Sequence, residues 1–288
     1  MAKVKKYLVL DCETATLPKV YEIAKTESEK QKAAIAKPLI YDIGWKVVDR
    51  NGKVYDRQQY LVTEIFCSPS IFNTAYYREK RPLYIEKLNK GEISLKSWGE
   101  ITTLLVESMR DTYAVGAYNA MFDFKKAIPF TELYMQKMLS ADFSQWLDSQ
   151  YNIVRDIVDG KRYENDKVFE PDIFRFKGCE YPLFDLWGLA CDKLYDNKNY
   201  KQMCVDNNFL TASGKYFKTS AEVGYRFITK DLNFIESHTA IEDADIECEI
   251  LRRIFATKKK NCFYIGIVYF PFRILGKVEE FTGEIFED

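Results

Sequence analysis

The chain has 288 residues, of which 47% are hydrophobic, and it carries a formal net charge of -1 with a pI near 6.1. The length and apolar content suit a globular protein with one large core, or a core domain with an appendage. The charge balance excludes a protein that holds nucleic acid or a membrane by bulk positive charge. No stretch reaches the roughly 18 apolar residues of a spanning helix, and the first apolar run is too short for a signal peptide, so we expect a cytoplasmic protein without a membrane partner.

The first predicted element is a buried strand that runs into two acids. Residues 7–10, Tyr-Leu-Val-Leu, form a short apolar run typical of the middle of a sheet. Asp11 and Glu13 follow, and side chains two apart on a strand point to the same face. Two carboxylates held close together repel each other, so we expect a positive group beside them.

The region after this strand predicts the beginning of a sheet. Residues 19–38 are charged and contain several alanines, which indicates a solvated helix or an ordered loop. Asn51 and Gly52 stand between two β-rich segments and predict a hairpin, so three strands are expected within residues 1–62. Residues 63–96 show no clear pattern.

A helix, a strand and an insertion follow in the middle of the chain. Ser97 and Glu100 form a capping box that opens an amphipathic helix. Residues 112–124 predict a strand that passes through a turn at Asn119 into a further helix. Residues 140–181 carry many charges and aromatic side chains without a clear period, so we interpret them as an insertion whose aromatic content favours packing on the core.

The C-terminal part of the chain predicts several helices and a tail. Residues 181–208 indicate a strand followed by two helices. Capping boxes begin at Thr219 and Thr239, and the second opens the most regular helix of the chain. The tail, residues 258–288, contains an apolar run at 262–270. We expect this run to pack on the domain as a strand, with an exposed partner-binding segment as the alternative.

Acids and the single histidine of the chain stand at the ends of three of these elements. With Thr239 as the N-cap, His238 lies just before the helix and Asp243 about one turn inside it, so both can face one cleft. Asp123 follows a predicted strand and turn, where α/β sheets tend to present site residues. Taken singly, a lone histidine is more often structural, and such an aspartate is more often a helix cap.

Together these acids predict a cation site. Four carboxylates in one cleft would repel one another unless divalent cations bound them, and hard oxygen ligands suit magnesium or manganese. The four are Asp11, Glu13, Asp123 and Asp243. The seven cysteines form no C-x-x-C pair, so neither a zinc site nor a disulfide framework is indicated.

Three motifs in this order resemble those of the DEDDh 3'-5' exonucleases, the family typified by the DnaQ-like proofreading subunits of DNA polymerases. They read LDCETAT, AYNAMFD and HTAIEDA, and the resemblance spans about residues 5–256. It implies a ribonuclease H-like α/β fold with a central mixed five-stranded sheet flanked by helices. It also implies an exonuclease domain over residues 1–257, with the insertion at about 140–181 between the second and third motifs, and a C-terminal extension over 258–288 packed on that domain.

The same resemblance implies the chemistry of the site. Two Mg²⁺ or Mn²⁺ ions would be bound by the four acids, with Asp11 bridging them, and His238 would take the proton from the attacking water. The substrate would be nucleic acid with a free 3' end, released as nucleoside 5'-monophosphates. Contacts to the terminal nucleotide are expected from four residues: Thr14, Tyr118, Asn119 and Phe122.

Several alternatives stay open. We expect single-stranded DNA as the substrate, with a replication or repair protein as a candidate partner. An RNA-directed exonuclease and a non-catalytic nucleic-acid-binding relative are the alternatives, while a two-metal phosphatase commonly recruits several histidines. The chain departs from the family at Ala15 and Thr16, and carries Tyr118 where many relatives have histidine. Lys258 to Lys260 are a candidate phosphate contact or a solvated helix end.

Overall fold

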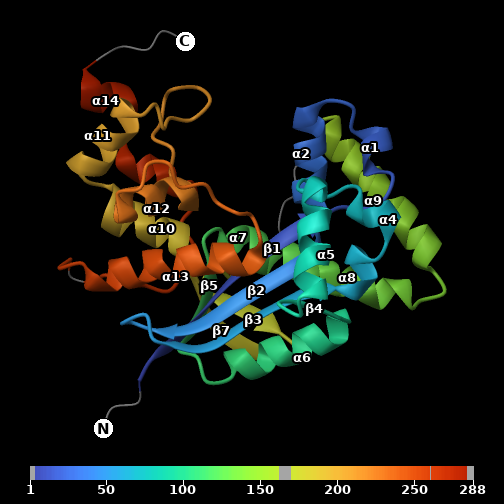
Figure 1. Ribbon diagram of the computed structural model, residues 1–288. Helices are drawn as coiled ribbons and strands as arrows, with labels where there is room; N and C mark the ends of the chain where they lie inside the picture. The colour runs from blue at the N-terminus through green and yellow to red at the C-terminus, as the bar shows by residue number, and fades with distance from the viewer. Residues whose placement is uncertain (1–3, 162–169, 260, 284–288) are drawn as a thin grey trace.

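The centre of the protein is a seven-stranded mixed sheet (Figure 1) in a computed structural model that describes residues 4–161, 170–259 and 261–283. Along the sheet the strands are β4 (Ser94–Lys96), β3 (Val54–Val62), β2 (Leu39–Asp49), β1 (Lys6–Ala15), β5 (Ala114–Ala117), β7 (Cys179–Asp185) and β6 (Ile173–Phe176). β1, β2 and β3 are antiparallel neighbours, whereas β5 is parallel to β1 and β7 is parallel to β5. The expected α/β class is confirmed, but the expected five strands are too few because β4 and β6 add an edge on each side.

Helices flank the sheet on both faces. In the first half of the chain they are α1 (Val20–Ile23), α2 (Glu27–Ala36), α3 (Thr63–Phe66), α4 (Pro69–Phe72), α5 (Arg81–Asn89), α6 (Trp98–Met109), α7 (Ala120–Phe122), α8 (Ile128–Met138) and α9 (Phe143–Val158). In the second half they are α10 (Leu186–Ala190), α11 (Lys198–Asp206), α12 (Ala221–Thr229), α13 (Ala240–Ala256) and α14 (Val278–Thr282). Short 3-10 turns cover Arg78–Lys80 and Pro271–Leu275, and π-helical turns cover Asp123–Ala127 and Cys191–Tyr195.

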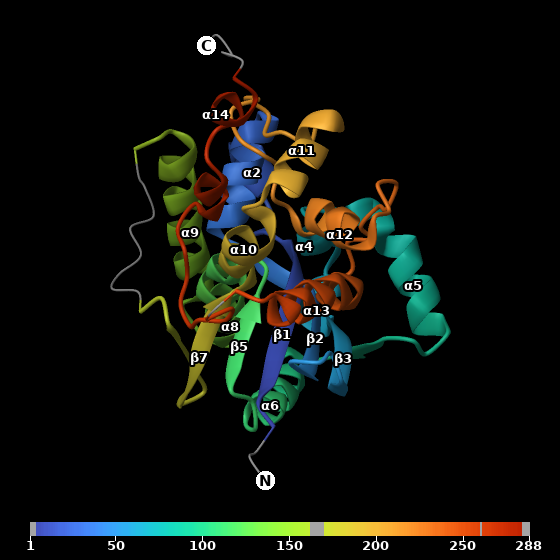
Figure 2. The same ribbon diagram turned by 90° about the vertical axis from the view of Figure 1, so that its left-hand side faces the viewer.

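The alternation of β1 separates two cores. Leu8 and Leu10 belong to the core that includes α6 and α8, whereas Tyr7 and Val9 belong to the core that includes α13. Figure 2 shows α13 lying across this second face of the sheet, over β1 and β2. Because side chains alternate along a strand, Asp11 and Glu13, which follow Val9 before the register shift, also face α13. The strand continues past the acids to Ala15, with a register shift after residue 13.

Local signals explain several helix ends. Ser97 Oγ accepts a hydrogen bond of 3.3 Å from the Glu100 N–H, and a Glu100 carboxylate oxygen accepts one of 2.9 Å from the Ser97 N–H, so this predicted capping box is confirmed. The box predicted at Thr219 is wrong by one residue. Ser220 is the N-cap of α12, because its hydroxyl accepts from the Val223 N–H.

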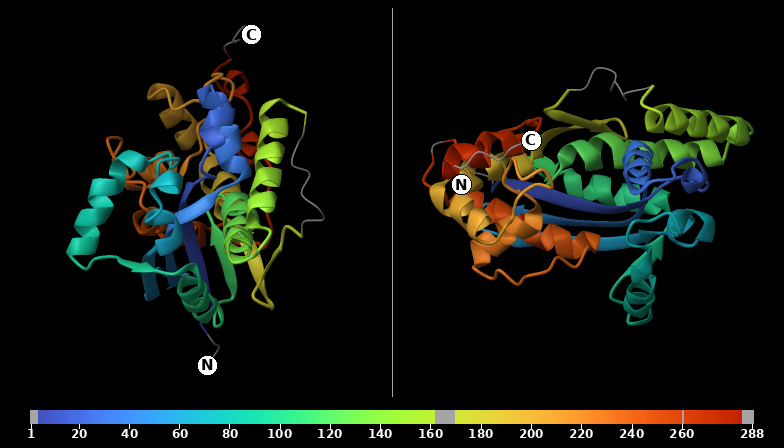
Figure 3. Two further views of the ribbon diagram at one scale, coloured as in Figure 1. Left: turned by 90° about the vertical axis from the view of Figure 1, so that its right-hand side faces the viewer. Right: turned by 90° about the horizontal axis from the view of Figure 1, so that it is seen from above.

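The insertion expected at 140–181 contains regular structure. It holds the 16-residue helix α9, strand β6 and the beginning of β7, while residues 162–169 lie outside the described residues. α9 packs beside α2 (Figure 3), and Trp146 stacks on Phe130 of α8 with ring centroids 6.1 Å apart. The interpretation of this region as one without a regular period was therefore wrong, because part of it forms an amphipathic helix.

The tail packs on the second core without forming the expected strand. Gly266 makes one bridge with Phe184, through hydrogen bonds with Leu183 and Asp185 of β7. Pairing stops there because Gly266 has a φ of 126°, outside the extended region. Phe263 packs on Tyr7 with ring centroids 4.9 Å apart. In the part of the chain that the structure describes, no helix has the length and apolar character needed to cross a membrane.

Candidate active site

The first turn of α13 is fixed against β2 by two residues. A Cβ on Gly44 would lie 2.5 Å from the backbone nitrogen of Ile241, so only glycine permits this close approach. Asp42 Oδ2 accepts a hydrogen bond of 3.0 Å from the Ala240 N–H at the start of the helix. The expected Thr239 box does not form, because the Thr239 hydroxyl donates to the Glu242 carboxylate instead. Asp42 acts as the cap from another element and holds the helix over β1.

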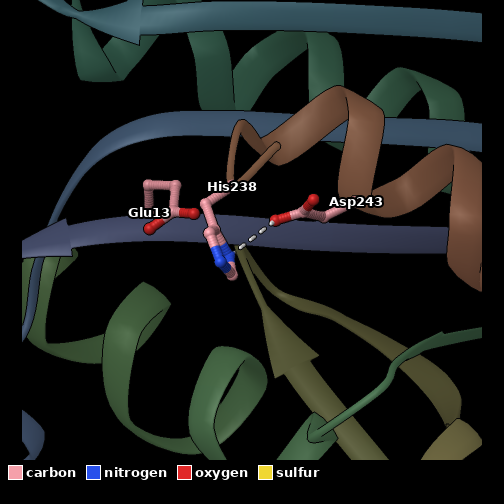
Figure 4. Close-up of side chains that lie close together, drawn as sticks. All are labelled: Glu13, His238 and Asp243. Carbon is pink, nitrogen blue, oxygen red and sulfur yellow. Dashed lines mark ion pairs between the residues drawn. The ribbon is translucent and has the colours of Figure 1, made fainter. Parts of the chain in front are cut away.

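Three predicted residues meet at this end of the helix. Figure 4 shows Glu13 on β1, His238 in the loop before α13 and Asp243 in its first turn, with their side chains turned toward one another. One ligand atom from each lies within 4.8 Å of the others, and His238 Nδ1 is 3.9 Å from Asp243 Oδ2. In the part of the chain that the structure describes, these three residues form the group of histidine, cysteine or acidic side chains whose ligand atoms lie close enough together to hold one metal ion.

Asp11 and Asp123 adjoin this group without belonging to it. Burial raises the pKa of Asp11 well above its usual range, and the neighbouring charge of Asp123 raises it further. The pKa of Glu13 is raised by burial and then by the charges of Asp11 and Asp243. Asp123 is 4% exposed at the start of a π-helical turn, and burial raises its pKa to about 8. The acids thus form one electrostatically linked row, and the positive charge of Lys80 lowers the pKa of Glu13 and of Asp243.

Buried oxygens in this row have no hydrogen-bond partner. They are Asp123 Oδ1, Asp243 Oδ1 and Glu247 Oε2. A buried polar atom without a partner costs about 1 to 3 kcal/mol, and more when the group is charged. Oxygens of this kind are the ligands that Mg²⁺ and Mn²⁺ prefer, so the donor set fits the cations that the sequence predicts.

His238 is held by residues from a region without a sequence pattern. Its imidazole stacks on Tyr77, with ring centroids 4.4 Å apart and planes inclined by 14°. The Lys80 ammonium lies 4.5 Å from the Tyr77 ring centroid and also donates to the Ser237 carbonyl. Burial lowers the pKa of His238 and Lys80 lowers it further, whereas Glu222 raises it. The net effect favours a neutral imidazole beside the acids.

A cavity of 490 Å³ opens beside Glu13. Its lining includes four aromatic side chains and two cations: Tyr21, Tyr76, Tyr77, Phe122, Lys30 and Arg78. Tyr76 is 66% exposed, so its ring is available to a ligand. Aromatic ring faces can stack on nucleic-acid bases, and lysine and arginine side chains can bind phosphates. Both kinds of side chain lie next to the candidate metal site.

The four expected substrate contacts divide into two pairs. Thr14 and Phe122 line the cavity. Tyr118 is instead buried in the second core, where its hydroxyl donates to the Thr219 carbonyl at 2.6 Å. Asn119 is exposed at the start of α7 and is not part of the cavity lining. The structure therefore corrects the expectation for Tyr118, whereas the expected contact from Asn119 stays a prediction.

Sequence reasoning missed several residues of the site. Glu247 follows Asp243 by four residues, a spacing that puts both on one helix face and was readable from the sequence. Tyr77, Lys80 and Asp42 reach the site only through tertiary packing, so no local signal identifies them. In the basic run after α13, Lys259 donates to the Asp192 carbonyl, and Lys260 lies outside the described residues.

Comparisons of the chain with protein-family models, with curated proteins and with solved structures find no match. Glu13 of β1 and Asp243 of α13 lie beside a single imidazole, and Asp11 and Asp123 adjoin them. The cavity next to Glu13 is lined by aromatic, cationic and acidic side chains.

Proposed function

We propose that the protein is a metal-dependent 3'-5' exonuclease of the DEDDh type, with a ribonuclease H-like fold. The observation that carries the proposal is the convergence of three distant segments. Asp11 and Glu13, then Asp123, then His238 and Asp243 gather at one end of α13, and buried carboxylate oxygens there have no hydrogen-bond partner. These are the five residues that the three sequence motifs assign to catalysis.

The architecture also supports the family assignment. Without the two edge strands, the sheet consists of β3, β2, β1, β5 and β7, a mixed five-stranded arrangement with helices on both faces. β4 has three residues, and β6 belongs to the region interpreted as an insertion. The acids lie on the central strand and on elements directly packed against it.

Different residues of the chain would bind the cations, accept the proton and position the catalytic groups. Asp11, Glu13, Asp123 and Asp243 would hold two divalent cations, which when bound supply positive charge for the phosphodiester oxygens and acidify a water molecule. His238, neutral because burial lowers its pKa, accepts the proton of the attacking water. Tyr77 fixes the plane of this imidazole, and Asp42 fixes the helix that presents Asp243.

The cavity beside Glu13 supports a nucleic-acid substrate. Its 490 Å³ lie within the usual range of ligand sites, about 300 to 1,000 Å³. Phe122 and Tyr76 offer ring faces for stacking, worth about 1 to 3 kcal/mol per base. Arg78 offers a charge for a phosphate, and so does Lys30, which pairs with Glu27 at 2.7 Å. We propose single-stranded DNA as the substrate because stacking requires unpaired bases, with RNA as the alternative.

Two other functions make different demands on the site. A non-catalytic nucleic-acid-binding relative requires none of the five residues, yet all five are present and gather in the fold. A phosphatase with two metal ions commonly uses several histidines, whereas this chain has one. His238 Nδ1 lies 3.9 Å from Asp243 Oδ2. The exonuclease explains this imidazole as a general base, whereas neither alternative requires it there.

Parallel digestion of single-stranded DNA, duplex DNA and RNA with Mg²⁺ or Mn²⁺ tests the proposal. We expect nucleoside 5'-monophosphates as products, and no products from the Asp11→Ala variant. Chromatography separates these nucleotides from free phosphate. Release of phosphate from a terminal phosphomonoester, without mononucleotides, would instead support the phosphatase, and binding without any product would support the non-catalytic relative.

A further inference from the structure

We propose that Glu247 is a further ligand of the divalent cation site, on the side of Asp11 and Asp123. This inference rests on the proposed function, because it extends the same cation site by one carboxylate. None of the three sequence motifs includes Glu247, and it lies four residues beyond the last of the acids they identify.

The relative direction of α13 and β1 places Glu247 over Asp11. At one end Glu13 and Asp243 approach within 4.8 Å, and at the other the rings of Tyr7 and Phe255 lie 4.9 Å apart, so the helix runs opposite to the strand. A helix rises about 1.5 Å per residue and a strand about 3.3 Å. Four residues along α13 therefore cover about 6 Å, as do two residues along β1.

Glu247 is buried and incompletely paired. It is 3% exposed, and its Oε2 is among the buried side-chain oxygens without a hydrogen-bond partner. Burial raises the pKa of its carboxyl well above the usual range, followed by the charges of Asp11, Asp123 and Asp243. The charges of these carboxylates act on Glu247, so its oxygen without a hydrogen-bond partner lies within a group of acids.

A structural role would be better served by an apolar residue. The next residues of α13 that are fully or almost fully buried are Ile250, Leu251 and Ile254. Glu247 precedes these residues on the same buried surface of α13. A carboxylate without a partner destabilises the fold there, whereas leucine or methionine would not. A divalent cation removes this cost, because it supplies the missing partner to several carboxylates at once. The position therefore points to a ligand.

The site then has two parts. In this assignment Glu13, Asp243 and His238 lie at the part next to the cavity, and Asp11, Asp123 and Glu247 would hold the inner ion. Glu247 would contribute to the ion farther from the imidazole. Its removal should therefore weaken the binding of one ion more than that of the other.

Titration of the purified full-length chain with Mn²⁺ tests this assignment, with electron paramagnetic resonance reporting the free ion. We expect Glu247→Gln to bind Mn²⁺ at least about 10-fold more weakly, or to lose one ion of two. Glu249→Gln is the matched control on the same helix, because Glu249 is 29% exposed and pairs with Arg252, and it should bind as the unmodified protein does.

Thermal unfolding in a chelator supplies the second readout. Glu247→Gln and Glu247→Met should both raise the midpoint of the metal-free protein, since each removes a buried charge, and both should gain less stability from Mn²⁺. Unchanged Mn²⁺ affinity and stoichiometry in a folded Glu247 variant would overturn the assignment of Glu247 alone. If the unmodified protein bound no Mn²⁺, the cation site of the proposed function would fail together with this inference.

Discussion

The imidazole of His238 stacks on the ring of Tyr77, with centroids 4.4 Å apart and planes inclined by 14°. His238 has a φ of 52°, a conformation that few residues other than glycine adopt without support. Lys80 supports the same loop by donating to the carbonyl of Ser237. One segment that is distant in the chain, residues 77–80, thus holds the proposed general base in one orientation.

This stack makes Tyr77 a positioning residue. Tyr77→Ala should lower turnover roughly 10- to 100-fold, because a misplaced imidazole meets the water poorly, whereas Tyr77→Phe keeps the ring and should retain most activity. His238→Ala should cost roughly 100- to 10,000-fold. Steady-state rates on a single-stranded oligonucleotide measure all three. Equal losses in Tyr77→Phe and Tyr77→Ala would assign the role to the hydroxyl instead.

The stability of the metal-free protein should fall as pH rises. Burial raises the pKa values of Asp42, Asp123 and Asp243 to about 6, about 8 and about 9, against 3.8 for an ordinary aspartate. Between these limits the folded state holds more protons than the unfolded state, so raising the pH removes stability. Thermal unfolding in a chelator from pH 5 to pH 9 measures this slope.

Added Mg²⁺ should reverse that slope. The cation replaces the protons on the acids, so its stabilisation should be larger at pH 8.5 than at pH 5.5. Unfolding midpoints with and without Mg²⁺ at both pH values provide the comparison. A gain in midpoint that is the same at both pH values would show that Mg²⁺ binds groups other than these acids.

Asp123→Asn should separate stability from activity. Removing one buried charge should raise the midpoint of the metal-free protein while abolishing turnover. Asp245→Asn is the matched control: Asp245 pairs with Lys46 and Arg57, so its loss should cost about 1 kcal/mol or less and leave the rate unchanged. Denaturant unfolding and initial rates measure both variants. A lower midpoint in Asp123→Asn would indicate a stabilising role for its charge.

Gly44→Ala should displace the first turn of α13. The added Cβ would lie 2.5 Å from the Ile241 backbone nitrogen, and overpacking of this kind costs about 1 to 3 kcal/mol. Because Asp243 lies in that turn, activity should fall as well. Gly99→Ala is the control, since a Cβ there meets nothing within 4 Å. A fully active Gly44→Ala variant would show that the position of α13 is not critical.

The sequence predicted the elements whose signals are local. The box at Ser97, the hairpin at Asn51 and Gly52, and the helix that carries Asp243 all depend on neighbours within a few residues, and the structure contains them. Helix α9 was missed although its apolar side chains recur at helical spacing, because several of them are aromatic and polar and charged residues separate them.

The candidate site was predicted less completely. The acids and His238 could be proposed because their order along the chain forms motifs. Tyr77 and Asp42 could not, since each contacts the site across the fold and neither has a local pattern. Tyr118 was expected at the substrate because of its place in the motif, but strand β5 ends at Ala117 and the Tyr118 side chain packs in the second core.

Digestion of a single-stranded DNA labelled at its 5' end tests the central claim most directly. With Mg²⁺, the unmodified protein should produce labelled fragments shortened one nucleotide at a time from the 3' end, and a chelator or Asp123→Asn should abolish them. Internal cleavage, or undiminished shortening in the chelator or by Asp123→Asn, would contradict a shared cation site at the convergence of these acids.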